Sequence, residues 1–153
     1  MNALELKVPP PVVALCLAML MWLTTRVIGP IEVPQMLRLG AALTFACVGL
    51  GLELAGVISF VQAKTTVNPL KPARASSLVS TGIYRVTRNP MYLGLLLMLL
   101  GWATFLANGL AYLPAPLFVL YINRFQIGPE ERMLLQKFGA GFSAYKARVR
   151  RWL

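Results

Sequence analysis

Gly82-Ile-Tyr-Arg-Val-Thr-Arg-Asn-Pro-Met-Tyr-Leu-Gly94 is a basic, aromatic and turn-prone segment that runs directly into a strongly apolar stretch. Pro90 disfavours helical backbone for the residue before it and suits the first turn of a helix, so Asn89 is predicted to be a helix N-cap. Arg and Tyr side chains concentrate where a membrane meets water. The segment therefore marks a junction between polar groups and an apolar helix, and the rest of the chain is placed around it.

Composition indicates an integral membrane protein. The chain has 153 residues, of which 58% are hydrophobic and only 13% are charged, whereas soluble domains carry about 25% charged residues. The apolar residues are clustered in long runs, which favours membrane spans over a soluble core. We expect an all-α fold: one domain, 1–153, forming a polytopic bundle of four or five transmembrane helices with a C-terminal amphipathic interfacial segment.

The apolar runs and the basic residues predict the topology. The expected spans are about 11–28, 37–62, 91–107 and 110–125, with a loop at 63–90 and a tail at 126–153. The loop carries five Lys and Arg residues and no acid, which places it in the cytoplasm. An even number of spans then puts both termini there too, and in a bacterium the membrane would be the inner one. The tail is predicted to form two short helices split at Gly139-Ala140-Gly141.

Charge and missing residue types exclude several functions. The net charge of +10 lies mostly beside the apolar runs, which fits anionic lipid head groups better than nucleic acid. The chain has no histidine, so the commonest general base and the commonest metal ligand are absent and no metal site is expected. Cys16 and Cys47 both fall within apolar runs and are interpreted as packing residues.

The third and fourth predicted spans form a hairpin that brings the segment around Tyr92 close to Glu130 and Glu131. Pro129 followed by two acids is a common helix start, and Arg and Tyr beside a span are ordinary membrane anchors. The functional alternative is that these carboxylates receive a cationic group of a ligand. Glu53 lies inside the second span, where an ionisable group is a site hypothesis by default, and its role stays open.

Three features together resemble one enzyme group. They are Arg88-Asn-Pro-Met-Tyr-Leu-Gly94, an apolar hairpin, and then Glu130-Glu131 with Phe138-Gly139…Phe142…Tyr145. The pattern is similar to the isoprenylcysteine carboxyl methyltransferase and phospholipid methyltransferase group of integral-membrane methyltransferases. The resemblance covers roughly residues 62–153, and the first two spans are not diagnostic. It implies S-adenosylmethionine as methyl donor, bound at the cytoplasmic end of the hairpin, and a lipid-like acceptor that enters from the bilayer.

The resemblance also implies site residues. In that group an Arg-His-Pro-x-Tyr-x-Gly segment and a Glu-Glu pair wrap the cofactor, which corresponds here to Arg88, Pro90, Tyr92, Gly94, Glu130 and Glu131. Asn89 stands where many members have histidine, so it can offer an amide hydrogen bond but cannot titrate. Phe142 stands where tyrosine is usual, and it has no hydroxyl.

The chemistry of the donor suggests a role for each group. A glutamate of the pair can bind the donor's amino group, Arg85 or Arg88 its carboxylate, and Tyr84 or Tyr92 its adenine or ribose. The predicted cofactor-binding set is Tyr84, Arg85, Arg88, Asn89, Pro90, Tyr92, Gly94, Glu130 and Glu131. The predicted catalytic set is Arg124, which would steer an anionic acceptor, and Glu131. Gly94 would permit close approach to the ligand.

The identity of the acceptor stays open between an isoprenylcysteine-like carboxylate, which needs no strong base, and a phospholipid amine, which must lose a proton. Two other functions remain as alternatives. One is a non-catalytic membrane subunit or assembly factor whose basic face binds anionic lipid. The other is a related methyltransferase that acts on a small thiol or amine.

Overall fold

The computed structural model describes residues 5–64 and 77–153 and is all-helical there, which confirms the expected fold class. The α-helices are α1 (Pro10–Val27), α2 (Gln35–Gln62), α3 (Pro90–Leu106), α4 (Pro114–Ile122) and α5 (Gly128–Arg148), and the short turns are η2 (Gly82–Arg85), η3 (Gly109–Tyr112) and the π-helical η4 (Asn123–Ile127). The first three predicted spans end within two residues of the observed helices.

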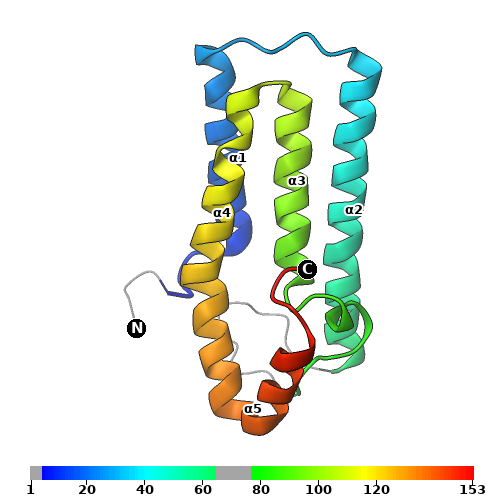
Figure 1. Cartoon of the computed structure of the whole chain (residues 1–153), viewed down its shortest axis with the longest axis vertical. Coiled ribbons are helices and arrows are strands. Elements are labelled where there is room, and N and C mark those ends of the chain that lie inside the picture. Colours follow the sequence, from blue (N-terminus) through cyan, green and yellow to red (C-terminus); the bar gives the residue numbers. More distant parts are fainter. Residues whose placement is uncertain (1–4, 65–76) are drawn as a thin grey trace.

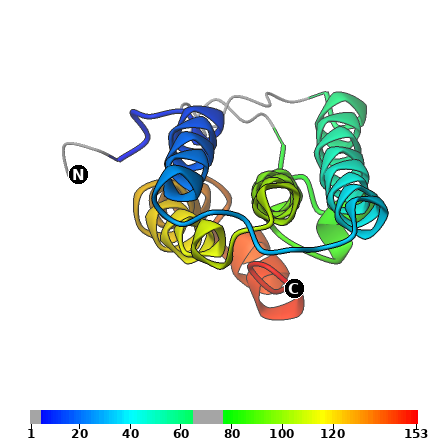
Figure 2. The same cartoon turned by 90° about the horizontal axis from the view of Figure 1, so that it is seen from above.

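The helices are arranged with α3 at the centre. Figure 1 shows α1 and α4 on one side of α3 and α2 on the other, and Figure 2 confirms this order from above. The α4–η4–α5 stretch continues below the bundle as one long helical rod, and its last part turns back toward the start of α3. The lower end of α3 is therefore enclosed by elements from both halves of the chain.

The contact between α2 and α3 depends on glycines. A Cβ atom on Gly94 would lie 2.6 Å from the carbonyl oxygen of Gly49 and 2.7 Å from Cγ of Glu53. The two backbones can approach this closely only because neither glycine has a side chain, as in small-residue interfaces of membrane helices. The structure thus assigns Gly94 to helix packing against α2, and its approach to a ligand stays a prediction.

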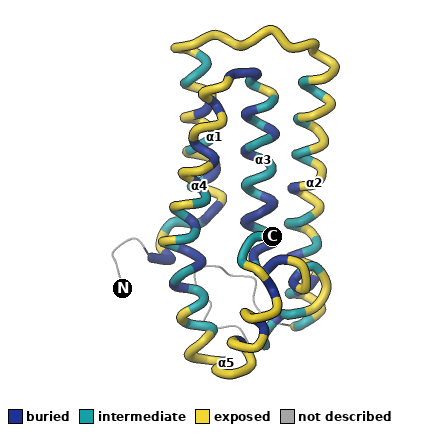
Figure 3. The backbone as a smooth tube through the Cα atoms, viewed as in Figure 1, coloured by how far each residue is buried: buried dark blue, intermediate teal, exposed yellow. Residues whose placement is uncertain are grey.

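Two helices meet the requirements for crossing a membrane. The most apolar 18-residue windows of α1 and α2 have mean hydropathies of 1.5 and 2.0, and only 22% and 17% of these windows are buried. Most of their apolar side chains are therefore exposed, as the exposed residues along α2 in Figure 3 illustrate. Such exposure fits contact with lipid. α3 is apolar but has 17 residues, and membrane crossing by α3 and α4 stays a prediction.

The fourth predicted span, 110–125, is interrupted. Its first residues form η3, α4 begins only at Pro114, and the helix widens into η4 at Asn123. In η4 the backbone N–H of Gly128 donates to the carbonyl of Asn123, five residues back. Pro129 explains the wider turn, because it has no N–H and its ring would crowd the carbonyl four residues before it.

The break in the tail is confirmed. Gly139 has φ 51° and ψ −121°, a conformation outside the helical region within α5. Glycine tolerates this left-handed φ because it has no Cβ. The residues after Gly139 fold back and place Phe142 and Tyr145 against Leu134 and Phe138.

Candidate methyl-donor site

The candidate site is built at the start of α3. Asn89 occupies the N-cap position and Pro90 the first helical position, as predicted, but the Asn89 side chain does not cap the helix. Its Nδ2 instead donates to the carbonyl of Arg151, at 2.8 Å. Tyr92 lies in the first turn of α3 and is buried. The helix start therefore contributes a buried phenol and holds the C-terminal end of the chain.

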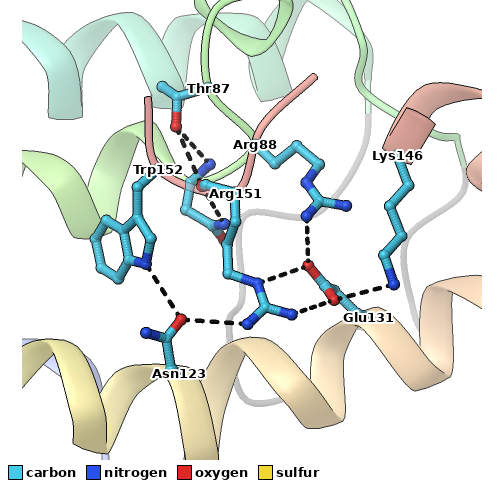
Figure 4. Close-up of polar contacts among 8 residues, drawn as sticks. Thr87, Arg88, Asn123, Glu131, Lys146, Arg151 and Trp152 are labelled. Atoms are coloured by element: carbon cyan, nitrogen blue, oxygen red, sulfur yellow. Dashed lines mark hydrogen bonds and ion pairs between the residues drawn. The ribbon is translucent and has the colours of Figure 1, made fainter. Parts of the chain in front are cut away.

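Glu131 is the centre of an ion-pair cluster (Figure 4). Its carboxylate lies 3.1 Å from Nη2 of Arg88, 2.8 Å from Nη2 of Arg151 and 3.6 Å from Nζ of Lys146. The side chains of Glu131 and Arg88 are only 12% and 10% exposed. One largely buried carboxylate thus holds three cations, and Lys146 is the most distant of them.

The guanidinium of Arg88 is only partly paired. Its Nη2 pairs with Glu131, but Nε and Nη1 are buried and have no hydrogen-bond partner among the described residues. Leaving charged donors buried and unpaired is costly, so native structures rarely do it without a reason. The two unpaired nitrogens of this guanidinium therefore mark places for an acceptor, such as a carboxylate oxygen.

Glu130 is held by neutral groups. Tyr92 Oη donates to its Oε1 at 2.6 Å, and Gln126 Nε2 donates to the same oxygen at 2.7 Å. The pKa of Glu130 is raised to about 7, mainly by burial and in part by the nearby Glu131, although the two hydrogen bonds lower it. This carboxyl can therefore exchange a proton near neutral pH.

This raised pKa predicts a pH dependence of stability. The ordinary pKa of a glutamate, which applies to the unfolded state, is 4.5. Between pH 4.5 and about pH 7, the folded state therefore holds more protons than the unfolded state. Stability contributed by Glu130 should therefore be full below pH 4.5 and fall as the pH rises to about 7. Glu130→Gln should remove this part of the slope, as measured by thermal unfolding in detergent from pH 4.5 to 8. Identical slopes for both proteins would contradict the assignment.

The last residues form a strap, 149–153, that closes one side of the site. Arg88 N–H donates to the carbonyl of Arg150 at 3.0 Å, and Thr87 Oγ1 donates to that of Arg151 at 3.3 Å. Trp152 Nε1 donates to Asn123 Oδ1 at 3.2 Å. The strap thus joins the start of α3 to η4, as Figure 4 shows.

A cavity of about 110 Å³ lies beside Arg88 and Glu131. Its wall is largely aromatic, with Phe60, Tyr84, Tyr92, Phe142 and Tyr145. Tyr145 Oη donates to the carbonyl of Tyr84 at 2.8 Å, which joins η2 to α5. The cavity therefore combines an ion pair at one side with ring faces around it.

The structure brings most of the predicted site residues together. Tyr84, Arg88, Asn89, Tyr92 and Glu131 line the cavity, and Glu130 adjoins it through its bond to Tyr92. Pro90 is buried and starts α3.

Two predicted residues lie elsewhere. Arg85 lines a separate hollow with Ser80 and Arg148. Arg124 is bound to Glu5, with Nη1 3.1 Å from Oε1, and Arg132 binds the same carboxylate. The structure does not bring Arg124 to the cavity, so its geometry gives no support to the expected catalytic role.

The sequence did not reveal several contributors to the site. In the sequence, Lys146 and Arg151 have the pattern of charges at a membrane interface. They reach Glu131 only because the chain folds back at Gly139. Gln126 had a usable signal, because it precedes Glu130 by four residues on a helix. Phe60 follows Glu53 by seven positions along α2 and shares its helical face, but an apolar ring in an apolar helix gives no signal of a site.

Comparison with known proteins identifies the family. The phospholipid methyltransferase family matches residues 37–141, more than half of the chain. This chain belongs to the phospholipid methyltransferase family. The match begins in α2, so this helix also belongs to the family unit, although its sequence alone was not diagnostic, and it extends just beyond the Gly139 break in α5.

Two relatives show how this family member compares with other proteins. An uncharacterized protein of Haemophilus influenzae is 54% identical over 63 residues, which are 41% of this chain and 100% of that protein. The protein-S-isoprenylcysteine O-methyltransferase of Schizosaccharomyces pombe is 30% identical over 112 residues, which are 71% of this chain and 46% of that enzyme. The chain thus matches under half of the yeast enzyme's length. No solved structure matches.

Proposed function

We propose that this member of the phospholipid methyltransferase family transfers a methyl group from S-adenosylmethionine to a hydrophobic, membrane-partitioned acceptor. The observation that carries the proposal is the partly unpaired guanidinium of Arg88. Two of its nitrogens are buried and have no partner among the described residues, and Arg88 lines an aromatic cavity next to the carboxylate of Glu131. In a methyltransferase family, this arrangement suits the amino-acid end of the methyl donor.

The amino-acid end of the donor is a zwitterion, and the site offers both complementary charges. Its carboxylate can accept a charge-assisted hydrogen bond from Nε or from Nη1 of Arg88. Its ammonium can pair with Glu131 by replacing Lys146, which has the longest contact, 3.6 Å, and a side chain that is 50% exposed. Arg151 would stay in place and keep the strap attached.

The aromatic wall suits the rest of the donor. Ring faces attract cations, so Tyr84 and Tyr145 can stabilise the sulfonium, and Phe60 and Phe142 offer apolar surface to the adenine. Sites for ligands of this size usually enclose about 300 Å³ or more, whereas this cavity has about 110 Å³. Binding of the whole donor therefore requires the cavity to widen.

The reaction needs alignment more than acid–base chemistry. A lone pair of the acceptor attacks the methyl carbon, the carbon–sulfur bond breaks, and sulfur keeps the electron pair as a neutral thioether. Holding the three atoms in line and excluding water supplies much of the rate enhancement. A carboxylate acceptor needs no base, whereas an amine must lose a proton, which Glu130 can accept with its pKa of about 7.

Basic residues favour a cytoplasmic position for the site. Arg85, Arg88 and Lys146 all lie at this end of the bundle, and positive charge gathers on the cytoplasmic side of membranes. The N-terminal segment reaches the same end, where Leu6 N–H donates to the carbonyl of Phe125. The opposite end holds the connections between α1 and α2 and between α3 and α4 (Figure 1). We therefore place both described ends of the chain in the cytoplasm.

Transfer of a radiolabelled methyl group tests the proposal. Purified protein in detergent would be incubated with labelled S-adenosylmethionine and a membrane lipid extract, and the organic phase counted. We expect label in the lipid fraction with the wild type and none with Tyr92→Ala. Release of the label as volatile methanol by mild alkali would identify a carboxyl methyl ester, whereas label that stays non-volatile after alkali would identify an N-methyl group. Label in small water-soluble compounds alone would contradict a lipid acceptor, and no label in any fraction would contradict the enzyme assignment.

A further inference from the structure

A second hollow lies at the opposite end of the bundle, away from the methyl-donor site. It has a volume of about 320 Å³ and is bounded by the start of α2, the end of α3, η3 and the connection before α2. Hydrogen bonds hold these parts together: Ile31 N–H donates to the carbonyl of Ala107 at 2.7 Å, and Asn108 Nδ2 donates to that of Ile28. The hollow is thus walled by segments that are bonded to one another.

One polar group of this hollow suits an anion. The Arg38 guanidinium lies 5.6 Å from the centre of the Phe105 ring. Its Nε is buried and has no hydrogen-bond partner within 5–64 or 77–153. The hydroxyls of Thr104 and Tyr112 on the same wall are bonded within the protein, since Thr104 Oγ1 donates to the carbonyl of Leu100 and Tyr112 Oη lies 2.9 Å from Thr104 Oγ1. The unpaired arginine donor is therefore the group that can bind a phosphate.

An apolar groove continues from this hollow along α2 and α3. The groove has a volume of about 320 Å³ and is lined by Ala41, Thr44, Phe45, Val48 and Leu97. Ala41 also lines the hollow around Arg38, so the two spaces adjoin. The α2 residues follow one another at three and four positions and therefore share one face of the helix. An anion site thus opens directly into an apolar slot.

We propose that this surface binds an anionic phospholipid, with its phosphate on Arg38 and one acyl chain in the groove. The proposal rests on α2 and α3 lying in a membrane, as their composition indicates. Both parts of the site are needed for the assignment: inorganic phosphate would leave the groove empty, and an uncharged lipid would leave the Arg38 donor unpaired. Because the site lies at the other end of α3 from the Arg88 cavity, this lipid is a bound lipid of the opposite leaflet and not the methyl acceptor.

Lipid binding by detergent-purified protein tests the proposal. Retention of phosphatidylglycerol would be measured by native mass spectrometry, with phosphatidylcholine and inorganic phosphate in parallel. We expect Arg38→Gln to bind phosphatidylglycerol about ten- to a hundredfold more weakly, since one charge-assisted hydrogen bond is lost. Arg26→Gln is the matched control, because Arg26 is another arginine, in the last turn of α1, and is stacked over Trp22. It should bind as the wild type does.

A second variant keeps the test decisive if Arg38→Gln folds poorly. Ala41→Phe should fill the junction of the two spaces and weaken phosphatidylglycerol binding by a similar factor. Unchanged lipid binding in either folded variant would overturn the proposal, as would displacement of the lipid by inorganic phosphate or equal retention of phosphatidylcholine. Binding of S-adenosylhomocysteine, measured on the same samples, should stay unchanged, so failure here is distinguishable from failure of the proposed methyl transfer.

Discussion

Arg88→Gln should weaken binding of S-adenosylhomocysteine, the demethylated donor, by about a hundredfold or more. Nε and Nη1 of Arg88 are the buried donors that we expect to bind the ligand's carboxylate. Hydrogen bonds to charged groups contribute roughly 1.5–3 kcal/mol each. Glutamine retains polarity at this position but has neither the positive charge nor the forked edge. Isothermal titration calorimetry of the protein in detergent measures the change directly.

Arg132→Gln is the matched control for this prediction. Arg132 is also an arginine paired with a glutamate, Glu5, at 2.8 Å, but it does not line the cavity. Its replacement should leave binding of S-adenosylhomocysteine within about twofold, a factor well below the 1.4 kcal/mol of a tenfold change. Arg88→Lys should give an intermediate loss, because the charge remains while the fork is absent. Equal binding by Arg88→Gln and the wild type would refute the role of Arg88.

Glu131→Gln should both destabilise the protein and abolish donor binding. The carboxylate holds Arg88, Arg151 and Lys146, and its removal leaves these cations close together without a counter-ion. Breaking a buried ion pair costs about 3–5 kcal/mol, and partial exposure of Arg151 and Lys146 reduces the expected loss to about 2–3 kcal/mol. Thermal unfolding and calorimetric titration would measure the two effects.

The control for Glu131→Gln is Glu32→Gln, which removes a carboxylate from an exposed position before α2. This variant should unfold at the wild-type temperature and bind S-adenosylhomocysteine normally. Glu131→Asp should keep part of the stability, since the charge remains, while the shorter side chain no longer reaches all three cations. An unfolding temperature for Glu131→Gln within about 1 °C of the wild type would show that the cluster contributes little.

Much of the helical framework could be predicted because apolar runs report helices directly. The segments around α1, α2 and α3 are long apolar stretches bounded by Pro or polar residues, and their limits follow from that pattern. The meeting of Tyr92 with Glu130 also followed from the hairpin of α3 and α4, and the structure confirms it with a hydrogen bond. The local sequence pattern and the short connection between the helices were sufficient to predict these features.

The placement of Arg124 shows where a regular pattern misleads. Arg124 and Glu131 are seven residues apart, so on an uninterrupted α-helix they would share a face. Arg124 lies within the π-helical turn η4, which accommodates extra backbone per turn before Glu131 is reached. The two side chains therefore point in different directions, and Arg124 binds Glu5 while Glu131 lines the cavity.

The strap could not be predicted because it depends on contacts far apart in the sequence. Asn89 binds the carbonyl of Arg151 across 62 positions, and no local pattern encodes such a pairing. The basic residues of the tail indicated an interfacial helix, and that pattern does not reveal that Arg151 turns inward. Gly94 is similarly ambiguous in the sequence, since a glycine can allow close approach of a ligand or of a neighbouring helix, and only the position of Gly49 reveals the helix contact.

The most direct test is an experimental structure of the protein with S-adenosylhomocysteine bound. We expect the ligand's carboxylate within hydrogen-bond distance of Nε or Nη1 of Arg88, and its amino group beside Glu131 in the place of Lys146. A ligand bound outside the cavity formed by α3, η2 and α5, or one whose carboxylate contacts another residue while both Arg88 donors stay free, would contradict the account.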